Sequence, residues 1–234
     1  MRLIQYFENG KRHVGWVKSD GDHACEIGSV SSVFELANLA IARKTGLASL
    51  VKELATDHTV DYAELLAKNQ VMAPIEHPEP ARFFITGTGL THIGSASARN
   101  KMHIATHGDG APESDSMKIF RMGLSGGKPE KGEIGIQPEW FYKGVGTCVL
   151  APGDPIPLPA FALAGAEEAE IVGLYMVGPD GQPYRIGYTL GNEFSDHLTE
   201  AQNYLYTQHS KLRACSMGPE LLVGDLPDDV RGKS

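Results

Sequence analysis

The sequence predicts an α+β fold, in which a small N-terminal α+β domain is followed by a β-rich domain with a mixed sheet. The chain has 234 residues, 41% of them hydrophobic and 21% charged, which is enough to bury one sizeable core. Residues 1–72 combine alternating strand patterns with helical ones. Residues 73–234 instead show short apolar runs separated by glycine and proline, and no glycine-rich nucleotide-binding motif follows a strand.

The N-terminal domain is expected to begin with a β-hairpin. Alternating apolar residues flank Asn9 and Gly10, and this dipeptide is a strong hairpin signal. Ser32 and Glu35 have the spacing of a capping box, which predicts the start of a helix. Two further segments have helical spacing, residues 47–54 and 61–68.

The second domain is expected to contain strands at four short apolar runs, residues 82–86, 140–142, 171–177 and 185–190. The turn residues at 178–181 predict that the last two runs form a hairpin. Residues 106–138 are rich in glycine, proline, serine and aspartate and show little periodicity. We expect a long loop there, either a lid over a site or a surface excursion.

Charge and hydropathy narrow the class of protein. The formal net charge is −8, and no run of five like charges occurs, so we expect neither a nucleic-acid nor a membrane partner. The N-terminus reaches a charged residue before any apolar stretch typical of a signal peptide, and no stretch approaches the roughly 20 apolar residues of a membrane helix. The expectation is a soluble cytoplasmic protein.

The three cysteines, Cys25, Cys148 and Cys215, are odd in number and far apart in the sequence. A disulfide framework typically has an even number of clustered cysteines in a short chain. We therefore expect free, buried thiols, and no pattern supports a cysteine nucleophile.

The densest chemical signal is a pair of acidic residues at the start of an apolar run. Glu168 and Glu170 are two positions apart, so in a strand both side chains point to one face. Two carboxylates placed together repel each other unless a cation lies between them or one is protonated. Oxygen ligands select hard cations such as Mg²⁺, Mn²⁺ or Ca²⁺. Alone, such a pair is more often a solvated acidic turn.

A second cluster strengthens this interpretation, because residues 191–197 end the other strand of the predicted hairpin. Glu193 in this cluster could supply a third carboxylate beside the Glu168 pair. Asp196, His197 and Glu200 are rival ligands. We interpret these three as a helix N-terminus capped by Ser195, where acidic residues suit the helix dipole.

The order of these motifs resembles the fumarylacetoacetate hydrolase family. An acidic Glu-x-Glu pair, a strand and the segment 187–195 follow one another as in that family, and three other parts of the chain agree with its motifs: residues 139–159, 210–219 and 88–92. The resemblance covers residues 82–220. It implies a β-roll-like catalytic domain over residues 73–234 that is short at its C-terminus relative to the family.

Carried over to this chain, the resemblance implies that Glu168, Glu170 and Glu193 bind Mg²⁺ or Mn²⁺. Family members often have aspartate at the third position, so Glu193 is a departure that keeps the ligand chemistry. Lys143 and Lys211 would lie near the metal as catalytic residues that hold a substrate carboxylate or act as a base. Without the motifs around them, both would be interpreted as ordinary surface lysines.

The resemblance also implies a catalytic role for His92, and substrate binding by Ser216, Gly218 and Pro219. In the hydrolases of the family, a histidine at this place works with a glutamate three residues later. Here that later position is Ser95, and a histidine without an acidic partner is a weaker base for activating water. C–C bond hydrolysis is therefore less expected, and His92 could equally be a structural loop residue.

Residues 88–103 and 192–213 resemble one branch of the family still more closely, the 2-keto-3-deoxy-sugar-acid dehydratases. The implied substrate is a small 2-oxo acid, such as 2-keto-3-deoxy-arabonate or a related pentonate. In this hypothesis the metal stabilises an enolate as a Lewis acid, a base (Lys211 or His92) removes the C3 proton, and the C4 hydroxyl leaves.

Other functions stay open at this point. The same metal site would serve an acylpyruvate-type hydrolase or an oxaloacetate-type decarboxylase. Because the chain ends at residue 234, earlier than the family pattern suggests, an inactive fragment or a 2-oxo-acid-binding protein is a further alternative. We also expect a homodimer, since family members commonly are dimers and an open sheet edge would need covering.

Overall fold

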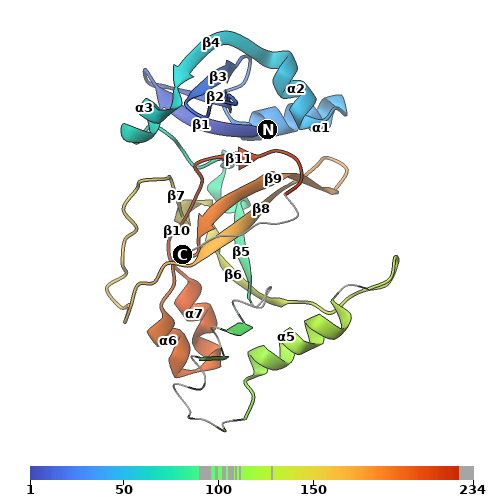
Figure 1. Ribbon diagram of the computed structural model, residues 1–234, viewed down its shortest axis with the longest axis vertical. Coiled ribbons are helices and arrows are strands. Elements are labelled where there is room, and N and C mark those ends of the chain that lie inside the picture. Colours follow the sequence, from blue (N-terminus) through green and yellow to red (C-terminus); the bar gives the residue numbers. More distant parts are fainter. Residues whose placement is uncertain are drawn as a thin grey trace.

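The computed structural model describes residues 1–89, 96–97, 100–101, 104, 108, 110, 112–127 and 129–226. Within these ranges the chain combines a large mixed sheet, a two-stranded sheet and short helices, so the predicted α+β class is confirmed (Figure 1). None of the described helices has both the length and the apolar character needed to cross a membrane.

The N-terminal part contains the hairpin and the helices that the sequence predicts. Asn9 and Gly10 both have positive φ angles, 50° and 77°, as the tight turn between β1 and β2 requires. The Ser32 hydroxyl accepts a hydrogen bond from the backbone N–H of Glu35 and so caps the first helix. The elements of this part are β1 Arg2–Glu8, β2 Lys11–Val17, β3 His23–Ile27, α1 Val33–Arg43, α2 Leu47–Leu54, β4 Ala55–Asp61 and α3 Tyr62–Ala67.

The later part supplies the predicted strands, with some changes at their ends. Pro80–Arg82 form the 3₁₀ helix η1, so the strand expected at residue 82 begins at Phe84. The remaining elements are β5 Phe84–Gly89, α5 Asp115–Gly126, β6 Glu139–Val145, η2 Gly146–Cys148, β7 Val149–Leu150, β8 Ala169–Val177, β9 Pro183–Asn192, α6 His197–Gln202, η3 Tyr204–Tyr206, α7 Thr207–Lys211, β10 Cys215–Met217 and β11 Leu221–Leu222. The predicted hairpin is confirmed as β8 and β9.

One continuous sheet joins the two parts of the chain. Its strand order is β4-β3-β2-β1-β11-β9-β10-β7, and β8 pairs with β9 beside this path. The short strand β11 makes the connection, because Leu222 lies opposite Arg2 of β1 and opposite Tyr188 of β9. β5 and β6 form the separate two-stranded sheet. The division of the chain into two domains at residue 72 stays a prediction.

The main hydrophobic core also spans both parts. It includes fully buried Leu3, Leu36 and Leu50 from the N-terminal elements together with Leu174 and Leu221 from the later strands. Burial of this kind contributes roughly 1.5–3 kcal/mol per large side chain. The core therefore holds the β8–β9 hairpin, on which the candidate site is built, against the N-terminal helices.

The expectation of an irregular loop over residues 106–138 is wrong for its centre, where α5 forms. Ser114 caps this helix by accepting a hydrogen bond from the Met117 N–H. In α5 the one buried residue is Ser116, yet Met117, Phe120 and Leu124 recur at helical spacing. The helical signal was therefore present in the sequence, together with the capping residue Ser114, and the glycines at positions 123, 126 and 127 obscured it.

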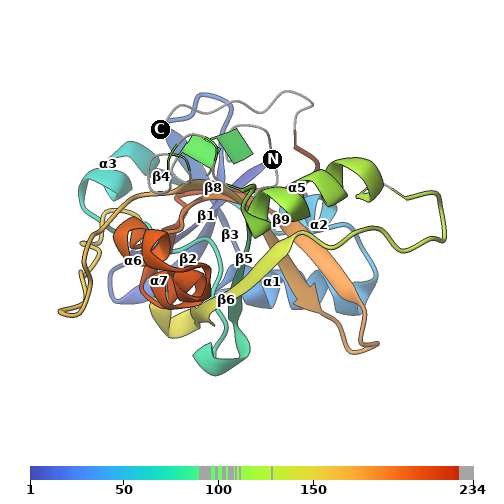
Figure 2. The ribbon, with the colours of Figure 1, turned by 90° about the horizontal axis from the view of Figure 1, so that it is seen from below.

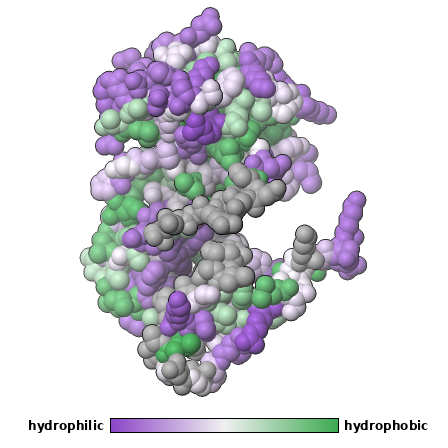
Figure 3. Space-filling model, in the orientation of Figure 1, coloured by the Kyte–Doolittle hydropathy of each residue, from purple (hydrophilic) through white to green (hydrophobic). Residues whose placement is uncertain are grey.

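The elements that surround the site come together below the sheet. Seen from below, α6 and α7 lie side by side and α7 packs against β6 (Figure 2). On the surface, apolar side chains gather along the left edge of Figure 3, over the segment between β7 and β8, where Leu158, Phe161 and Leu163 are exposed.

Candidate active site

The β8–β9 hairpin brings three glutamates together. Glu170 lies in β8 opposite Gly191 of β9, Glu168 immediately precedes β8, and Glu193 immediately follows β9. The backbone N–H of Glu193 donates to the Glu168 carbonyl at 2.8 Å, which extends the pairing past the strand ends. As a result, one carboxylate oxygen of each glutamate lies within 4.8 Å of the others.

Lys211, the last residue of α7, reaches into this cluster. Its side chain is 6% exposed, and its Nζ lies 2.8 and 2.6 Å from the two carboxylate oxygens of Glu168 and 3.1 Å from Oε2 of Glu193. Nζ also lies 5.2 Å from the ring centroid of Phe141, on β6. Burial alone would lower the pKa of Lys211, but the charges of Glu168 and Glu193 outweigh it and raise the pKa. The lysine therefore stays positively charged.

The pKa values of the two glutamates beside Lys211 are shifted in opposite directions. Burial would raise the pKa of Glu168, but the hydrogen bond from His197 and the charge of Lys211 hold it below its usual range. Burial raises the pKa of Glu193 to about 8, because the neighbouring Glu168 carboxylate adds to the cost of a second charge and Lys211 compensates only in part. The pair thus holds a proton near neutral pH in the absence of a metal.

The donor set fits a hard divalent cation. Three carboxylates meet in one place, Lys211 offsets one negative charge, and burial together with the charge of Glu168 still pushes Glu193 toward protonation. A divalent cation would remove that penalty, and oxygen-only ligation suits Mg²⁺ or Mn²⁺.

Lys143 contacts the backbone of the site instead of its carboxylates. It lies on β6, is buried, and its Nζ donates to the carbonyl oxygens of Glu193 (3.3 Å), Phe194 (2.8 Å) and Lys211 (3.1 Å). These three bonds use all the donors of an ammonium group. Burial lowers the pKa of Lys143, although the nearby charge of Glu193 opposes the shift. This geometry ties the loop after β9 to the end of α7.

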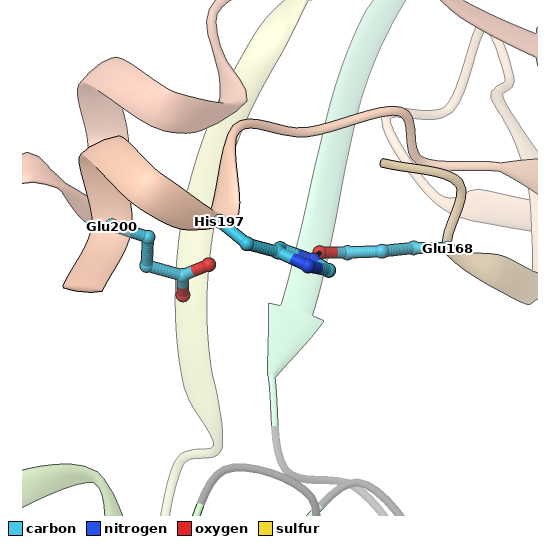
Figure 4. Close-up of side chains that lie close together, drawn as sticks. All are labelled: Glu168, His197 and Glu200. Carbon is cyan, nitrogen blue, oxygen red and sulfur yellow. Dashed lines mark hydrogen bonds and ion pairs between the residues drawn. The ribbon is translucent and has the colours of Figure 1, made fainter. Parts of the chain in front are cut away.

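A second group of potential ligands includes residues that the sequence analysis assigned to a helix N-terminus. His197 and Glu200 are three residues apart on α6, so they share one face of the helix. Nε2 of His197 lies 2.7 Å from Oε1 of Glu168, and Glu168, His197 and Glu200 have ligand atoms within 4.8 Å of one another (Figure 4). The hydrogen bond with Glu168 raises the pKa of His197. The predicted helix N-terminus is present at this place, and the contact of His197 with Glu168 is an addition to it that the sequence did not indicate.

The helix cap itself also differs from the expectation. Asp196, not Ser195, caps α6, because its carboxylate accepts hydrogen bonds from the N–H and hydroxyl of Thr199. Ser195 instead donates its hydroxyl to the Glu193 carbonyl at 2.7 Å. The fully buried Asp196 also lies 3.6 Å from Arg213, which leaves it no freedom to serve as a ligand.

An open groove of about 1390 Å³ borders the carboxylates. Glu170, Glu193 and Ser216 line it, so this predicted substrate-binding serine lies near the cluster. The other two predicted substrate-binding residues, Gly218 and Pro219, come directly after β10 and do not line the groove. His92, the other predicted catalytic residue, lies outside the described residues.

Glu139 is a further acidic residue that the sequence analysis quoted only as part of a motif. It alternates with Phe141 and Lys143 on β6, and all three are buried on the same face of that strand. Its Oε2 is buried and has no hydrogen-bond partner among the described residues. The alternation of residues 139, 141 and 143 in a strand was the signal that could have marked it.

Gly87 allows β5 to approach the site closely, and this leads to a testable prediction. A Cβ atom at this position would overlap the Phe141 ring and the Glu193 carboxylate. Gly87→Ala is expected to displace Glu193 and to weaken Mn²⁺ binding at least about tenfold in calorimetric titrations. The matched control is Gly123→Ala on α5, where a Cβ meets nothing within 4 Å and binding should not change. Unchanged affinity in Gly87→Ala would contradict the placement of Glu193.

The proton held by Glu193 predicts a pH dependence of metal binding. Its pKa is raised to about 8, so below that pH a proton must leave before the carboxylate can bind a cation. Affinity for Mg²⁺ should therefore rise with pH, by at most about tenfold per unit, and level off above pH 8. Titration calorimetry in buffers of different ionisation enthalpy should detect release of the proton. Binding that is independent of pH and releases no proton would refute this prediction.

Comparison with solved structures defines the fold. The chain matches 2-keto-3-deoxyarabinonate dehydratase with a TM-score of 0.65 at 18% identity, over 98% of this chain and 68% of that one. A structure of 2-keto-3-deoxy-D-arabinonate dehydratase complexed with magnesium and 2,5-dioxopentanoate matches with a TM-score of 0.62 at 18% identity and the same coverage. Fumarylacetoacetate hydrolase from Exiguobacterium antarcticum matches with a TM-score of 0.52 at 15% identity, over 95% of this chain and 66% of that one. The family resemblance is thus confirmed in the fold.

Comparison with curated sequences finds a protein that is similar to part of this chain. A probable 2-keto-3-deoxyxylonate dehydratase of Haloferax volcanii is 33% identical over 96 residues, which cover 40% of this chain and 30% of the relative. The chain therefore aligns with less than a third of that protein. No family model matches the chain.

Proposed function

We propose that this chain belongs to the dehydratase branch of the fumarylacetoacetate hydrolase family and is a divalent-metal-dependent dehydratase of a 2-keto-3-deoxy sugar acid. The observation that carries the proposal is the convergence of Glu168, Glu170 and Glu193 beside a buried, charged Lys211. Support comes from the fold match to a dehydratase whose structure holds magnesium and 2,5-dioxopentanoate, and from the curated relative named for a related substrate.

Glu168, Glu170 and Glu193 are the proposed ligands of Mg²⁺ or Mn²⁺. When bound, the cation would supply Lewis-acid chemistry that draws electrons from the 2-oxo acid and makes its C3 protons more acidic. Ser216 is proposed to contact the substrate from the groove beside these ligands. Gly218 and Pro219 do not line that groove, so a contact of these two residues with the substrate rests on the sequence resemblance alone.

The two lysines are proposed to act differently. Lys211 keeps its charge next to the carboxylates, which suits stabilisation of negative charge on the substrate better than removal of a proton. Lys143 donates to three carbonyl oxygens around the site, which supports a role in positioning Glu193 and Lys211. His92 stays the proposed base for the C3 proton, as the sequence resemblance implies.

Proton NMR of the purified protein with a 2-keto-3-deoxypentonate in D₂O tests the reaction, first with Mg²⁺ and then with EDTA. We expect loss of the C3 signals and formation of an aldehyde product with Mg²⁺, and neither with EDTA. C3 exchange without loss of water would overturn the dehydratase proposal in favour of an acylpyruvate or oxaloacetate substrate. The absence of exchange under both conditions would overturn the enzymatic proposal in favour of a 2-oxo-acid-binding protein or an inactive fragment.

We further propose that the protein works in the cytoplasm as a homodimer. The apolar side chains of Leu158, Phe161 and Leu163 are each more than half exposed, and such clusters are typical of interaction surfaces. In the described part of the chain β8 pairs with β9 alone, so its other edge is open to pairing. Light scattering coupled to size exclusion should give twice the chain mass of 25.2 kDa, and a monomer mass would refute the dimer.

A further inference from the structure

Two of the three free cysteines meet at the edge of the candidate site. Cys148 ends η2 directly before β7, and Cys215 begins β10. β7 and β10 pair in parallel with Val149 opposite Cys215, which brings the Sγ atoms of Cys148 and Cys215 to 4.0 Å. Cys25 belongs to β3, where its thiol lies 2.8 Å from the Thr56 carbonyl.

The geometry of the pair suits a reaction between the two sulfurs. A disulfide needs a sulfur separation of about 2.05 Å, so closing the present gap requires a shift of roughly 2 Å. Cys148 is partly exposed, whereas Cys215 is buried but lines the open groove, from which a small oxidant can approach the pair. The hydrogen bond with the Cys215 thiol lowers the pKa of Cys148 to about 7, which favours the nucleophilic thiolate.

We propose that Cys148 and Cys215 are a redox-active pair that peroxide converts reversibly into a disulfide. The Cys148 thiolate attacks one oxygen of hydrogen peroxide, whose O–O bond breaks, and forms a sulfenic acid; the oxygen that leaves takes up a proton and becomes water. The Cys215 sulfur then attacks the Cys148 sulfur, the S–O bond of the sulfenic acid breaks, and the leaving hydroxyl takes up the Cys215 thiol proton to become the second water. In total, two thiols lose two electrons and two protons, and peroxide is reduced to two molecules of water.

The position of the pair links this modification to the site. Cys215 lines the same groove as Glu170 and Glu193, and Ser216 follows it directly. On the other side, a Cβ atom added at Gly144 would lie 2.8 Å from the Cys148 sulfur, so Cys148 packs against the residue that follows Lys143. Drawing the sulfurs together therefore changes the packing beside both the groove and Lys143. We expect oxidation to lower turnover, an effect that rests on the proposed function.

The bond itself is tested on the full chain without any substrate. Treatment of the reduced protein with hydrogen peroxide should lower the thiol count from three to one and the intact mass by about 2 Da, and dithiothreitol should reverse both. Peptide mapping should join Cys148 to Cys215. The Cys25→Ser variant should behave in the same way, and Cys148→Ser should form no bond. A gain of oxygen without a cross-link, or a bond that includes Cys25, would overturn the proposal.

A second measurement tests the effect on the site. Oxidised wild-type protein should lose at least tenfold in kcat/KM for the 2-keto-3-deoxypentonate and recover it with dithiothreitol, whereas Cys148→Ser should keep its activity under peroxide. A disulfide that forms and leaves turnover unchanged would overturn the regulatory effect. If the reduced protein has no activity at all, the proposed function fails, and the thiol count and mass still decide whether the pair exists.

Discussion

Replacing Glu168 with glutamine is expected to lower kcat/KM for a 2-keto-3-deoxypentonate by about 1000-fold or more and to abolish measurable Mg²⁺ binding. Glu168 is the carboxylate on which both groups of potential ligands depend, because it lies with Glu170 and Glu193 on one side and with His197 and Glu200 on the other. The amide keeps the size of the side chain, removes its charge and replaces one acceptor oxygen with a donor NH2 group.

The test of this prediction combines calorimetric titration of Mn²⁺ with the NMR assay. Glu167→Gln is the matched control, because Glu167 is exposed and adjacent in the sequence but absent from both groups of ligands. Both binding and turnover should survive in the control. A Glu168→Gln variant that binds Mn²⁺ as tightly as the wild-type protein would remove Glu168 from the metal site.

The parts of the fold that the sequence predicts well are those with local signals. The turn at Asn9 and Gly10 needs positive φ angles that these residues adopt easily, and the Ser32 cap is a contact between neighbours in the sequence. The helix α5 was missed although Met117, Phe120 and Leu124 have helical spacing, because the surrounding segment is rich in glycine, proline and serine.

For the candidate site as well, the features that could be predicted are those with a local signal in the sequence. Glu168, Glu170 and Glu193 could be predicted together because a single hairpin with a recognisable turn brings them opposite one another. The contact of His197 with Glu168 could not be predicted, because it depends on how the chain leaves β9, which no local pattern specifies. Cys148 and Cys215 are 67 positions apart and are brought together by two short parallel strands. The periodicity of the sequence does not indicate that these strands pair.

A substitution of Lys211 is expected to affect metal binding and turnover in opposite directions. Replacing it with methionine keeps an unbranched side chain of similar length but removes the ammonium group that lies between Glu168 and Glu193 and faces the Phe141 ring. Turnover should fall by about 1000-fold or more, because the charge that stabilises the developing negative charge on the substrate is lost. Affinity for Mg²⁺ should rise about tenfold, because a buried cation next to the ligands repels the metal.

The Lys211→Met variant should also differ from the wild-type protein in its thermal stability when no metal is bound. Removing one partner of a buried ion pair costs about 3–5 kcal/mol, so the melting temperature of the metal-free protein should fall by about 10 °C. Adding Mg²⁺ should then raise it more than in the wild-type protein, because the metal replaces the missing charge. Lys131→Met, at an exposed position, should show none of these changes. If Lys211→Met lost metal binding together with turnover, the lysine would be shaping the metal site itself, and its proposed role in stabilising charge on the substrate would have to be given up.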